Sequence, residues 1–157
     1  MMGGAHGKIL HVDLTSKGIR IEEPDEACYR LLVGGRAMVA HLLLRDLAPQ
    51  TDPLSPDNLL IFAPGIMQGT SFPGAGRHGV GGKSPLTGAL GSSEVGGWWG
   101  HEFKLAGYDA LVITGAAERL VYLAVDGEHV EIRPAEALAG MNVIETGRVI
   151  RDRIEGA

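Results

Sequence analysis

Cysteine is nearly absent from the sequence, because Cys28 is the only one among 157 residues. A single thiol cannot close an internal disulfide, and by itself it cannot hold an iron–sulfur cluster or a zinc finger. Cys28 lies in DEACYRLLV, a segment with helical character, where we expect a buried packing thiol. The sequence therefore predicts no cysteine-based metal centre on this chain.

Concentrated positive charge and long apolar runs are missing as well. The 14 lysines and arginines are scattered and the formal net charge is -5, so the electrostatic footprint of a nucleic-acid-binding protein is lacking. No apolar run approaches the roughly 18 residues of a membrane span, and MMGGAHGK lacks the regions of a signal peptide. We expect a cytoplasmic protein that binds neither nucleic acid nor membrane and forms a single domain over residues 1–157.

Glycine, by contrast, is abundant and concentrated. Residues 64–100 hold twelve of the 24 glycines. Because glycine loses more backbone freedom on folding than any other residue, such density is typical of backbone that turns sharply or approaches another group closely. The stretch also contains Phe72, Trp98 and Trp99, which a solvated linker has no reason to carry. We interpret it as a surface that faces a ligand, with a long flexible loop as the alternative.

Hydrophobic periodicity predicts an α+β fold with antiparallel or mixed sheets, because the expected strands lie in hairpins rather than alternating singly with helices. Hairpins are expected over 8–23 and 120–133, the second around the turn signal Asp126-Gly127. The other predicted elements are helices over 27–33, 36–47, 96–106 and 143–154, a short helix opening at Pro134, and buried strands over 59–63 and 110–114. In the second helix the residues expected to face the core are Met38, Val39, Leu42 and Leu43.

Each hairpin is followed by a proline and an acidic helix start, in KILHVDLTSKGIRIEEPDEA and in LVYLAVDGEHVEIRPAEA. Repetition of a whole unit indicates an internal duplication of a hairpin and a helix. Chance recurrence of a common motif is the alternative, and the sequence leaves both open.

Two nucleotide-binding motifs fit the letters of the sequence but not its context. Gly82-Lys83-Ser84 would end a phosphate-binding loop, yet Arg77 stands where the first glycine must be and the turn-like PLTG follows where a helix must begin. Lys83 is therefore predicted to be a structural or surface lysine. Gly74 to Gly79 matches G-x-G-x-x-G, but no helix follows it to complete a dinucleotide-binding unit. The serines and histidines form no nucleophile–base pattern, so no catalytic residue is predicted.

Arg77 is the strongest binding candidate in the sequence. A guanidinium set among glycines can approach a phosphate and bind it through two hydrogen bonds, and a surface ion pair is the alternative. Gly96 and Gly97 are predicted to open a helix, whose free amides favour an anion. Just before them, Glu94 would cap that helix or ligate a metal that bridges the anion.

Several motifs resemble, in this order along the chain, the N-terminal domain of the tungsten-containing aldehyde ferredoxin oxidoreductases: GKILHVDLTSKGIRIEE, LLVGGRA, DPLSPDNLLIFAPG, KSPLTG and KLAGYDALVITG. The resemblance implies an α+β domain with an internal duplication, which forms a base under the two pterins of a tungsten (or molybdenum) cofactor. It implies that Arg77 contacts a pterin phosphate and that the backbone of Val95, Gly96 and Gly97 lies against the cofactor. The family usually has asparagine in place of Glu94, near the magnesium that bridges the two pterin phosphates, so Glu94 is a candidate magnesium ligand that adds negative charge beside the phosphates.

The resemblance also implies how the activity is divided. The complete enzyme oxidises an aldehyde to a carboxylate and passes electrons to ferredoxin, with its iron–sulfur cluster and acid–base groups in later domains. We therefore expect this chain to be the cofactor-binding N-terminal domain or subunit, inactive alone and completed by C-terminal domains or a separate catalytic subunit. The alternatives are a non-catalytic pterin- or phosphate-binding protein, a scaffold that forms homo-oligomers through an exposed apolar surface, and a truncated gene product.

Overall fold

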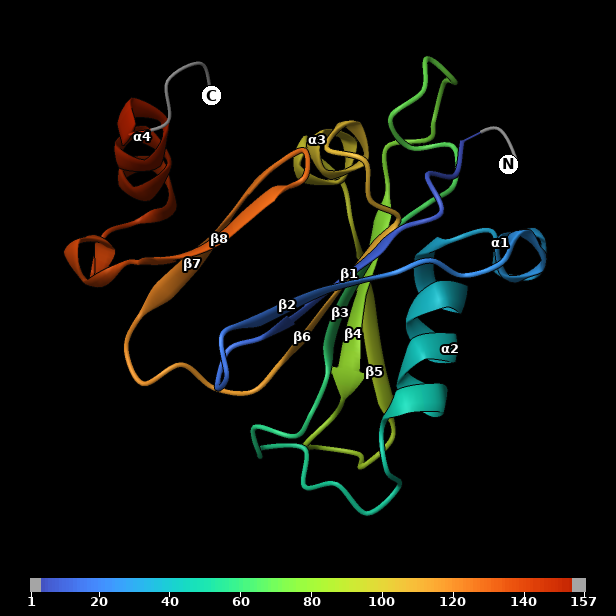
Figure 1. Cartoon of the computed structure of the whole chain (residues 1–157), viewed down its shortest axis with the longest axis horizontal. Helices are drawn as coiled ribbons and strands as arrows, with labels where there is room; N and C mark the ends of the chain where they lie inside the picture. The colour runs from blue at the N-terminus through green and yellow to red at the C-terminus, as the bar shows by residue number, and fades with distance from the viewer. Residues whose placement is uncertain (1–3, 154–157) are drawn as a thin grey trace.

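The computed structural model describes residues 4–153 (Figure 1). In chain order its elements are β1 (Ile9–Asp13), β2 (Gly18–Glu22), α1 (Glu26–Leu32), α2 (Gly35–Asp46), β3 (Leu60–Pro64), β4 (His78–Lys83), β5 (Leu90–Val95), α3 (Trp99–Leu105), β6 (Ala110–Thr114), β7 (Val121–Asp126), β8 (His129–Pro134), the 3-10 helix η1 (Glu136–Leu138) and α4 (Val143–Arg153). Within the described residues, no helix has both the length and the apolar character needed to cross a membrane.

Six strands form one mixed sheet in the order β2-β1-β6-β3-β4-β5. The pair β1–β6 is parallel and the other neighbours are antiparallel. The hairpin β7–β8 forms a separate two-stranded sheet. This arrangement confirms the predicted α+β fold with mixed sheets.

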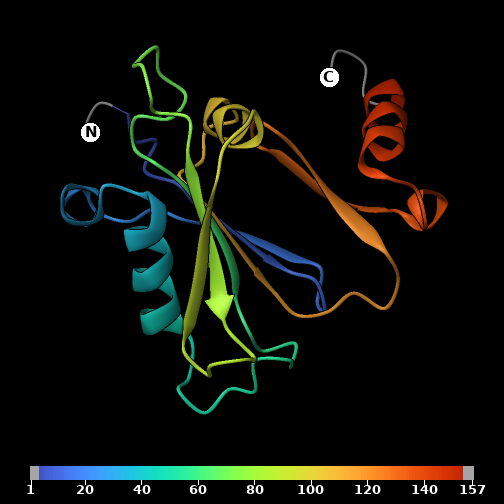
Figure 2. The same ribbon diagram turned by 180° about the vertical axis from the view of Figure 1, so that it is seen from behind.

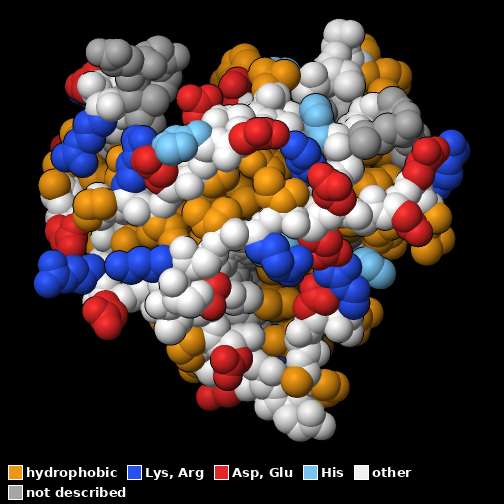
Figure 3. Space-filling view, in the orientation of Figure 1, with side chains coloured by type: hydrophobic (Ala, Val, Ile, Leu, Met, Phe, Trp, Pro, Cys, Tyr) orange, Lys and Arg blue, Asp and Glu red, His pale blue; other side chains and the backbone are white. Residues whose placement is uncertain are grey.

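Both faces of the six-stranded sheet are covered (Figure 1). On one face, α2 lies alongside β4 and β5, as Figure 2 shows from behind, and packs Met38 and Leu42 against Ile9 and Ile61. On the other face, α3 and the hairpin β7–β8 cover Leu10 and the residues around it. Figure 3 shows apolar side chains gathered over the space between the hairpins β1–β2 and β7–β8. Successive side chains of β1 point to opposite faces of the sheet, so Ile9 lies in one core and Leu10 and Val12 lie in the other.

The first two helices form as the sequence predicts. The Asp25 side chain caps α1 by accepting a hydrogen bond from the Cys28 amide at 2.9 Å. Cys28 itself is half-buried against the core, a packing position, rather than fully buried. The four predicted core residues of α2 are all buried.

Two predicted details are wrong. The helix expected over 96–106 begins only at Trp99, because Gly97 has a φ of 99°, outside the helical region, and Gly96 precedes it. In the second hairpin Asp126 pairs with His129, so the two turn residues are Gly127 and Glu128, one position later than expected. Gly127 has the positive φ of 56° that such a turn requires.

The glycine-rich stretch contains β4 and β5, two strands that the sequence did not reveal. Glycine has low β propensity, so the strand signal is weak. The glycines are nevertheless needed for packing, because a Cβ added at Gly81 would lie 2.6 Å from Val39 Cγ1 of α2 and 2.7 Å from the Gly91 carbonyl oxygen. The alternative of a long flexible loop is wrong for this part of the stretch.

The order hairpin, proline, helix recurs at both ends of the described chain, with Pro24 before α1 and Pro134 before η1 and α4. The first hairpin is the edge of the six-stranded sheet, whereas the second pairs with no further strand within residues 4–153.

Candidate functional site

The start of β4 and the end of β5 lie together at one edge of the sheet. Gly79 pairs with Glu94, and His78 pairs with Val95. Arg77 directly precedes β4 and Gly96 directly follows β5, where a Cβ added to Gly96 would lie 3.8 Å from the Gly76 carbonyl oxygen. The structure therefore brings the predicted site residues to one place, which we call the glycine edge (Arg77–Gly79 and Glu94–Gly97).

Helix α2 begins directly against the glycine edge. A Cβ added at Gly79 would lie 2.9 Å from the backbone nitrogen of Arg36, so only glycine admits the helix this close to the strand. The preceding Gly34 forms an isolated bridge with Gly65, whose amide donates to the Arg77 carbonyl oxygen at 3.2 Å. Backbone contacts thus fix the start of α2 relative to Arg77.

Arg36 is a charged residue of this edge that sequence reasoning missed. Its Nε lies 3.1 Å from Oε1 of Glu94, with both side chains about half exposed (62% and 47%). The only signal in the sequence is an arginine after two glycines at a predicted helix start. Its meeting with Glu94, 58 positions later in the chain, depends on the fold.

The Arg77 side chain is exposed, and no carboxylate of residues 4–153 forms an ion pair with it. The surface ion pair considered as its alternative role is therefore not formed within the described part of the chain. A cavity of about 270 Å³ lies beside it, lined by Val33, Gly65, Ile66, Met67, Gly74, Ala75 and Arg77. Such an unpaired guanidinium beside glycine backbone is suited to an oxyanion.

The two tryptophans after the glycine edge have different environments. Trp99 stacks on Phe103 with 4.9 Å between ring centroids and lies 4.8 Å from the His78 ring. Trp98 is 80% exposed, and its one ring contact within residues 4–153 is the edge-on contact with His101, with 6.3 Å between ring centroids. Neither tryptophan is a buried core residue, because Trp99 remains 40% exposed in spite of these ring contacts.

His78 is 4% exposed, and its Nδ1 has no hydrogen-bond partner within residues 4–153. Burial lowers the pKa of His78 below its ordinary value of 6.5. The unfolded chain therefore binds a proton at this residue at a higher pH than the folded chain does.

This difference predicts a pH dependence of folding. Stability should be full above pH 6.5 and fall as the pH drops through the window between 6.5 and the lower folded pKa. His78→Phe should reduce the slope of unfolding free energy against pH between 5.5 and 7.5, measured by urea denaturation. Burial lowers the pKa of His11 too, so part of the slope should remain. An unchanged slope in His78→Phe would contradict the assignment.

Lys83 is structural, as predicted. Its Nζ donates to the carbonyl oxygens of Pro49 at 2.6 Å and Thr51 at 2.8 Å. These bonds connect the end of β4 to the loop before β3. The Lys83 ammonium is thus used in a structural contact and not in a phosphate-binding loop.

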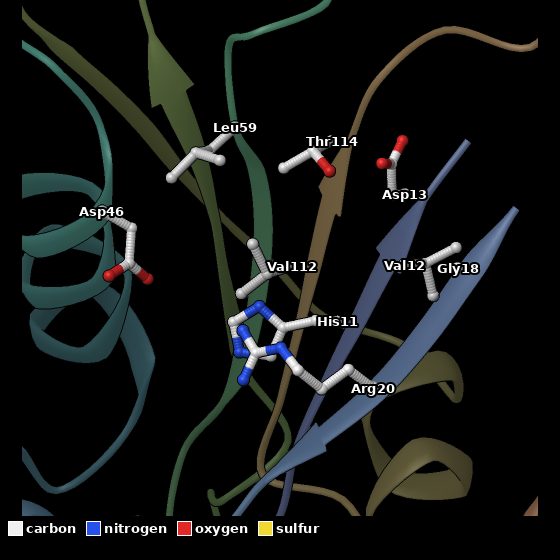
Figure 4. Close-up of a pocket in the computed structure, with 9 residues that line it drawn as sticks. All are labelled: His11, Val12, Asp13, Gly18, Arg20, Asp46, Leu59, Val112 and Thr114. Carbon is white, nitrogen blue, oxygen red and sulfur yellow. The ribbon is translucent and has the colours of Figure 1, made fainter. Parts of the chain in front are cut away.

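A separate polar cavity of about 300 Å³ lies at the other end of α2 (Figure 4). In Figure 4, His11 and Arg20 lie side by side on β1 and β2, Asp46 faces them from the end of α2, and Val112 of β6 lies next to His11. The His11 Nε2 lies 2.8 Å from Glu22 Oε2, so His11 links the two strands of the first hairpin. Asp46 is the last residue of α2, so the length of this helix, about 18 Å for 12 residues, separates it from the start of α2 at the glycine edge.

Within the part of the chain that the structure describes, no three acidic, histidine or cysteine residues converge as a metal site. Glu94 is the sole carboxylate among the predicted site residues, so a metal at this edge needs further ligands from a bound group or another part of the enzyme.

The mixed sheet, the glycine edge and its arginines define a class of protein: an α+β domain that presents glycine backbone and guanidinium groups on one edge. The chain belongs to the aldehyde ferredoxin oxidoreductase family, since the family model described as "Aldehyde ferredoxin oxidoreductase, N-terminal domain" matches residues 9–157. This match confirms the resemblance seen in the sequence.

Similar proteins and a solved structure support this family assignment. The chain is 44% identical to the tungsten-containing aldehyde ferredoxin oxidoreductase of Pyrococcus furiosus and 41% identical to that of Thermococcus kodakarensis, in each case over 98% of this chain and 25% of the relative. It is 35% identical to the "Aliphatic sulfonate oxidoreductase, WOR-like subunit" of Pyrococcus furiosus over 89% of this chain and 23% of that protein. A chain in the active site complex BamBC of benzoyl coenzyme A reductase with 1,5-dienoyl-CoA superposes with a TM-score of 0.94 at 38% identity, over 99% of this chain and 24% of that one. The chain thus spans about a quarter of the length of these relatives.

Proposed function

We propose that this chain is the cofactor-binding N-terminal domain or subunit of a tungsten (or molybdenum) bis-pterin oxidoreductase of the cytoplasm. The complete enzyme oxidises an aldehyde to a carboxylate and passes the electrons to ferredoxin. Two relatives named as tungsten-containing aldehyde ferredoxin oxidoreductases support the activity. The observation that carries the proposal for this chain is that Arg77, which forms no ion pair within residues 4–153, lies together with glycine backbone at the glycine edge.

The residues of the glycine edge fit a phosphate-bearing group. Arg77 binds a pterin phosphate through its guanidinium, while the backbone of Val95, Gly96 and Gly97 admits the cofactor closely because two of these residues lack side chains. Glu94 would offer a carboxylate ligand to a magnesium ion bound with the phosphates. When bound, the cofactor supplies the redox chemistry, and the protein positions it.

The remaining parts of the enzyme come from C-terminal domains or a separate subunit. One cysteine is too few for an iron–sulfur cluster, so the cluster and the catalytic residues lie elsewhere. The isolated chain should show no aldehyde oxidation with a viologen dye under anaerobic conditions, and turnover by the isolated chain would overturn this division of roles.

The test is metal and pterin content of the protein purified without oxygen from its native host, by plasma mass spectrometry and pterin fluorescence. We expect tungsten or molybdenum with about two pterins per metal when the partner is present. Protein that is empty in the assembled state would overturn the proposal.

Arg77→Ala in the assembled enzyme is expected to weaken cofactor retention by about 1.5–3 kcal/mol, the contribution of one charge-assisted hydrogen bond. The measurement is metal per protein after dialysis, with the exposed Arg30→Ala of α1 as the control. Metal content that is equal in the two variants would remove Arg77 from the site.

A second candidate is a scaffold that self-associates through apolar surface. Large apolar side chains are exposed at several places, including Leu86, Trp98, Val143 and Ile144. Light scattering tests this candidate by measuring the molar mass over a range of protein concentrations. A protein that stays monomeric at all concentrations would argue against self-association.

A further inference from the structure

We propose that Arg36 is a second anion-binding residue of the glycine edge, held in place by Glu94, and that Glu94 acts through Arg36 rather than as a metal ligand. This inference rests on the proposed function and changes the role of one of its residues. It starts from the ion pair between Arg36 Nε and Glu94 Oε1.

Arg36, Arg77 and Glu94 share one face of the sheet. The Gly79 position faces α2, because a Cβ there would meet the Arg36 backbone. Side chains two positions apart along extended backbone point to the same side, which puts Arg77 on the face of Gly79. Glu94 is the cross-strand partner of Gly79 and points to that face too, consistent with its ion pair to Arg36.

Arg36 is held at both ends. Its backbone lies against Gly79, and its guanidinium lies beside the Glu94 carboxylate through Nε. An arginine has five donor hydrogens, and contact through Nε leaves the four on the terminal nitrogens. No hydrogen bond from these nitrogens to an acceptor of residues 4–153 is formed. They are available to an anion.

The charges favour this arrangement. Glu94 alone would cancel Arg77 and repel a phosphate, whereas Arg36 leaves the three side chains with a net charge of one positive unit. A half-exposed ion pair adds little to folding stability, so its value lies in placing the guanidinium. The chemistry that two guanidinium groups recognise is a pair of adjacent phosphoryl groups.

Inorganic pyrophosphate carries two such groups and serves as the probe for the isolated chain at low ionic strength. Side-chain Nε–H resonances of ¹⁵N-labelled protein report on each arginine. We expect pyrophosphate to shift the Arg36 and Arg77 resonances together, with the same dissociation constant and without added magnesium. A shift at Arg77 alone, or no binding, would overturn the inference.

Variants separate the two roles of Glu94. Arg36→Ala should weaken pyrophosphate binding at least tenfold. The matched control is Arg30→Ala, since Arg30 is equally exposed (66%) and pairs with Glu26 on α1, and it should leave binding unchanged. Glu94→Gln removes the negative charge but keeps a side chain of the same size with an oxygen beside Arg36, so binding should be equal or tighter, while Glu94→Ala should weaken it severalfold. Binding that requires magnesium and disappears in Glu94→Gln would instead make Glu94 a metal ligand.

Backbone amide spectra of each variant establish that α2 is intact, so that loss of binding reports on the guanidinium. Failure of this inference differs from failure of the proposed function. Tungsten and pterin in the assembled protein together with an inert Arg36 would leave the proposed function standing. Pyrophosphate bound by Arg36 in a protein whose assembled form holds no pterin would leave an anion site with another ligand.

Discussion

Asp109→Ala is expected to lower the free energy of unfolding by about 3–5 kcal/mol, because it leaves the buried Lys104 ammonium without its partner. Only 3% of the Lys104 side chain and 6% of the Asp109 side chain are exposed. The Lys104 Nζ binds the Asp109 carboxylate and donates to the Gly4 carbonyl oxygen at 2.5 Å. Urea denaturation of the isolated chain measures the loss.

Asp109 also holds the segment that enters β1. Its Oδ2 accepts hydrogen bonds from the amides of His6 at 2.9 Å and Gly7 at 2.7 Å. Lys104→Met keeps these bonds, so it should cost less than Asp109→Ala. The double variant Lys104→Met/Asp109→Leu should recover only part of the loss, because the amides stay without an acceptor.

The exposed loop residue Asp57 provides the control, since Asp57→Ala should change stability by about 0.5 kcal/mol or less. Full recovery in the double variant would show that the ion pair alone matters and that the amides find other partners. Equal effects at Asp57 and Asp109 would contradict the structural role of the pair.

The fold was predictable wherever local periodicity and local contacts decide it. The two outer hairpins, the cap of α1 at Asp25 and the buried face of α2 follow from residues close in sequence. The strands β4 and β5 were not predictable. Their glycines are required by close contacts with α2, a helix that lies far from them in the sequence. The start of α3 was missed for a related reason, since only the fold gives Gly97 its positive φ.

The specific motifs of the family have a physical explanation in the fold. In KSPLTG, Lys83 ties β4 to a distant loop, and the Gly88 amide donates to the Ser84 carbonyl oxygen to close the turn. In KLAGYDALVITG, Lys104 and Asp109 form the buried pair and Gly107 has the positive φ of 97° that ends α3. These residues support the fold, not a site.

The candidate site was predictable only in part. The glycines around Arg77 predicted an anion-binding site, and the structure brings Arg77, Glu94 and Gly96 together. Arg36 could not be found, because its place beside Glu94 depends on how α2 crosses β4. The contacts of these residues with pterin, phosphate and magnesium stay predictions.

Gly34→Ala is expected to cost about 3–5 kcal/mol, from strained backbone and displaced neighbours together. Gly34 has φ 77° and ψ -160°, a region reserved for glycine. A Cβ there would lie 2.5 Å from the Pro64 carbonyl oxygen and 3.1 Å from the Ile66 amide nitrogen. Thermal and urea unfolding of the isolated chain measure the cost.

The adjacent Gly35→Ala separates the two causes, because Gly35 also has a positive φ, 58°, but nothing lies within 4 Å of an added Cβ. It should cost only about 1–2 kcal/mol, the conformational part. Gly34 pairs with Gly65, and the Gly65 amide donates to the Arg77 carbonyl oxygen. A shift of the backbone at Gly34 should therefore move Arg77, so Gly34→Ala should also weaken pyrophosphate binding in protein that remains folded. Equal stability loss in the two variants would mean that backbone conformation, not the contact with Pro64, requires glycine where α2 meets the edge.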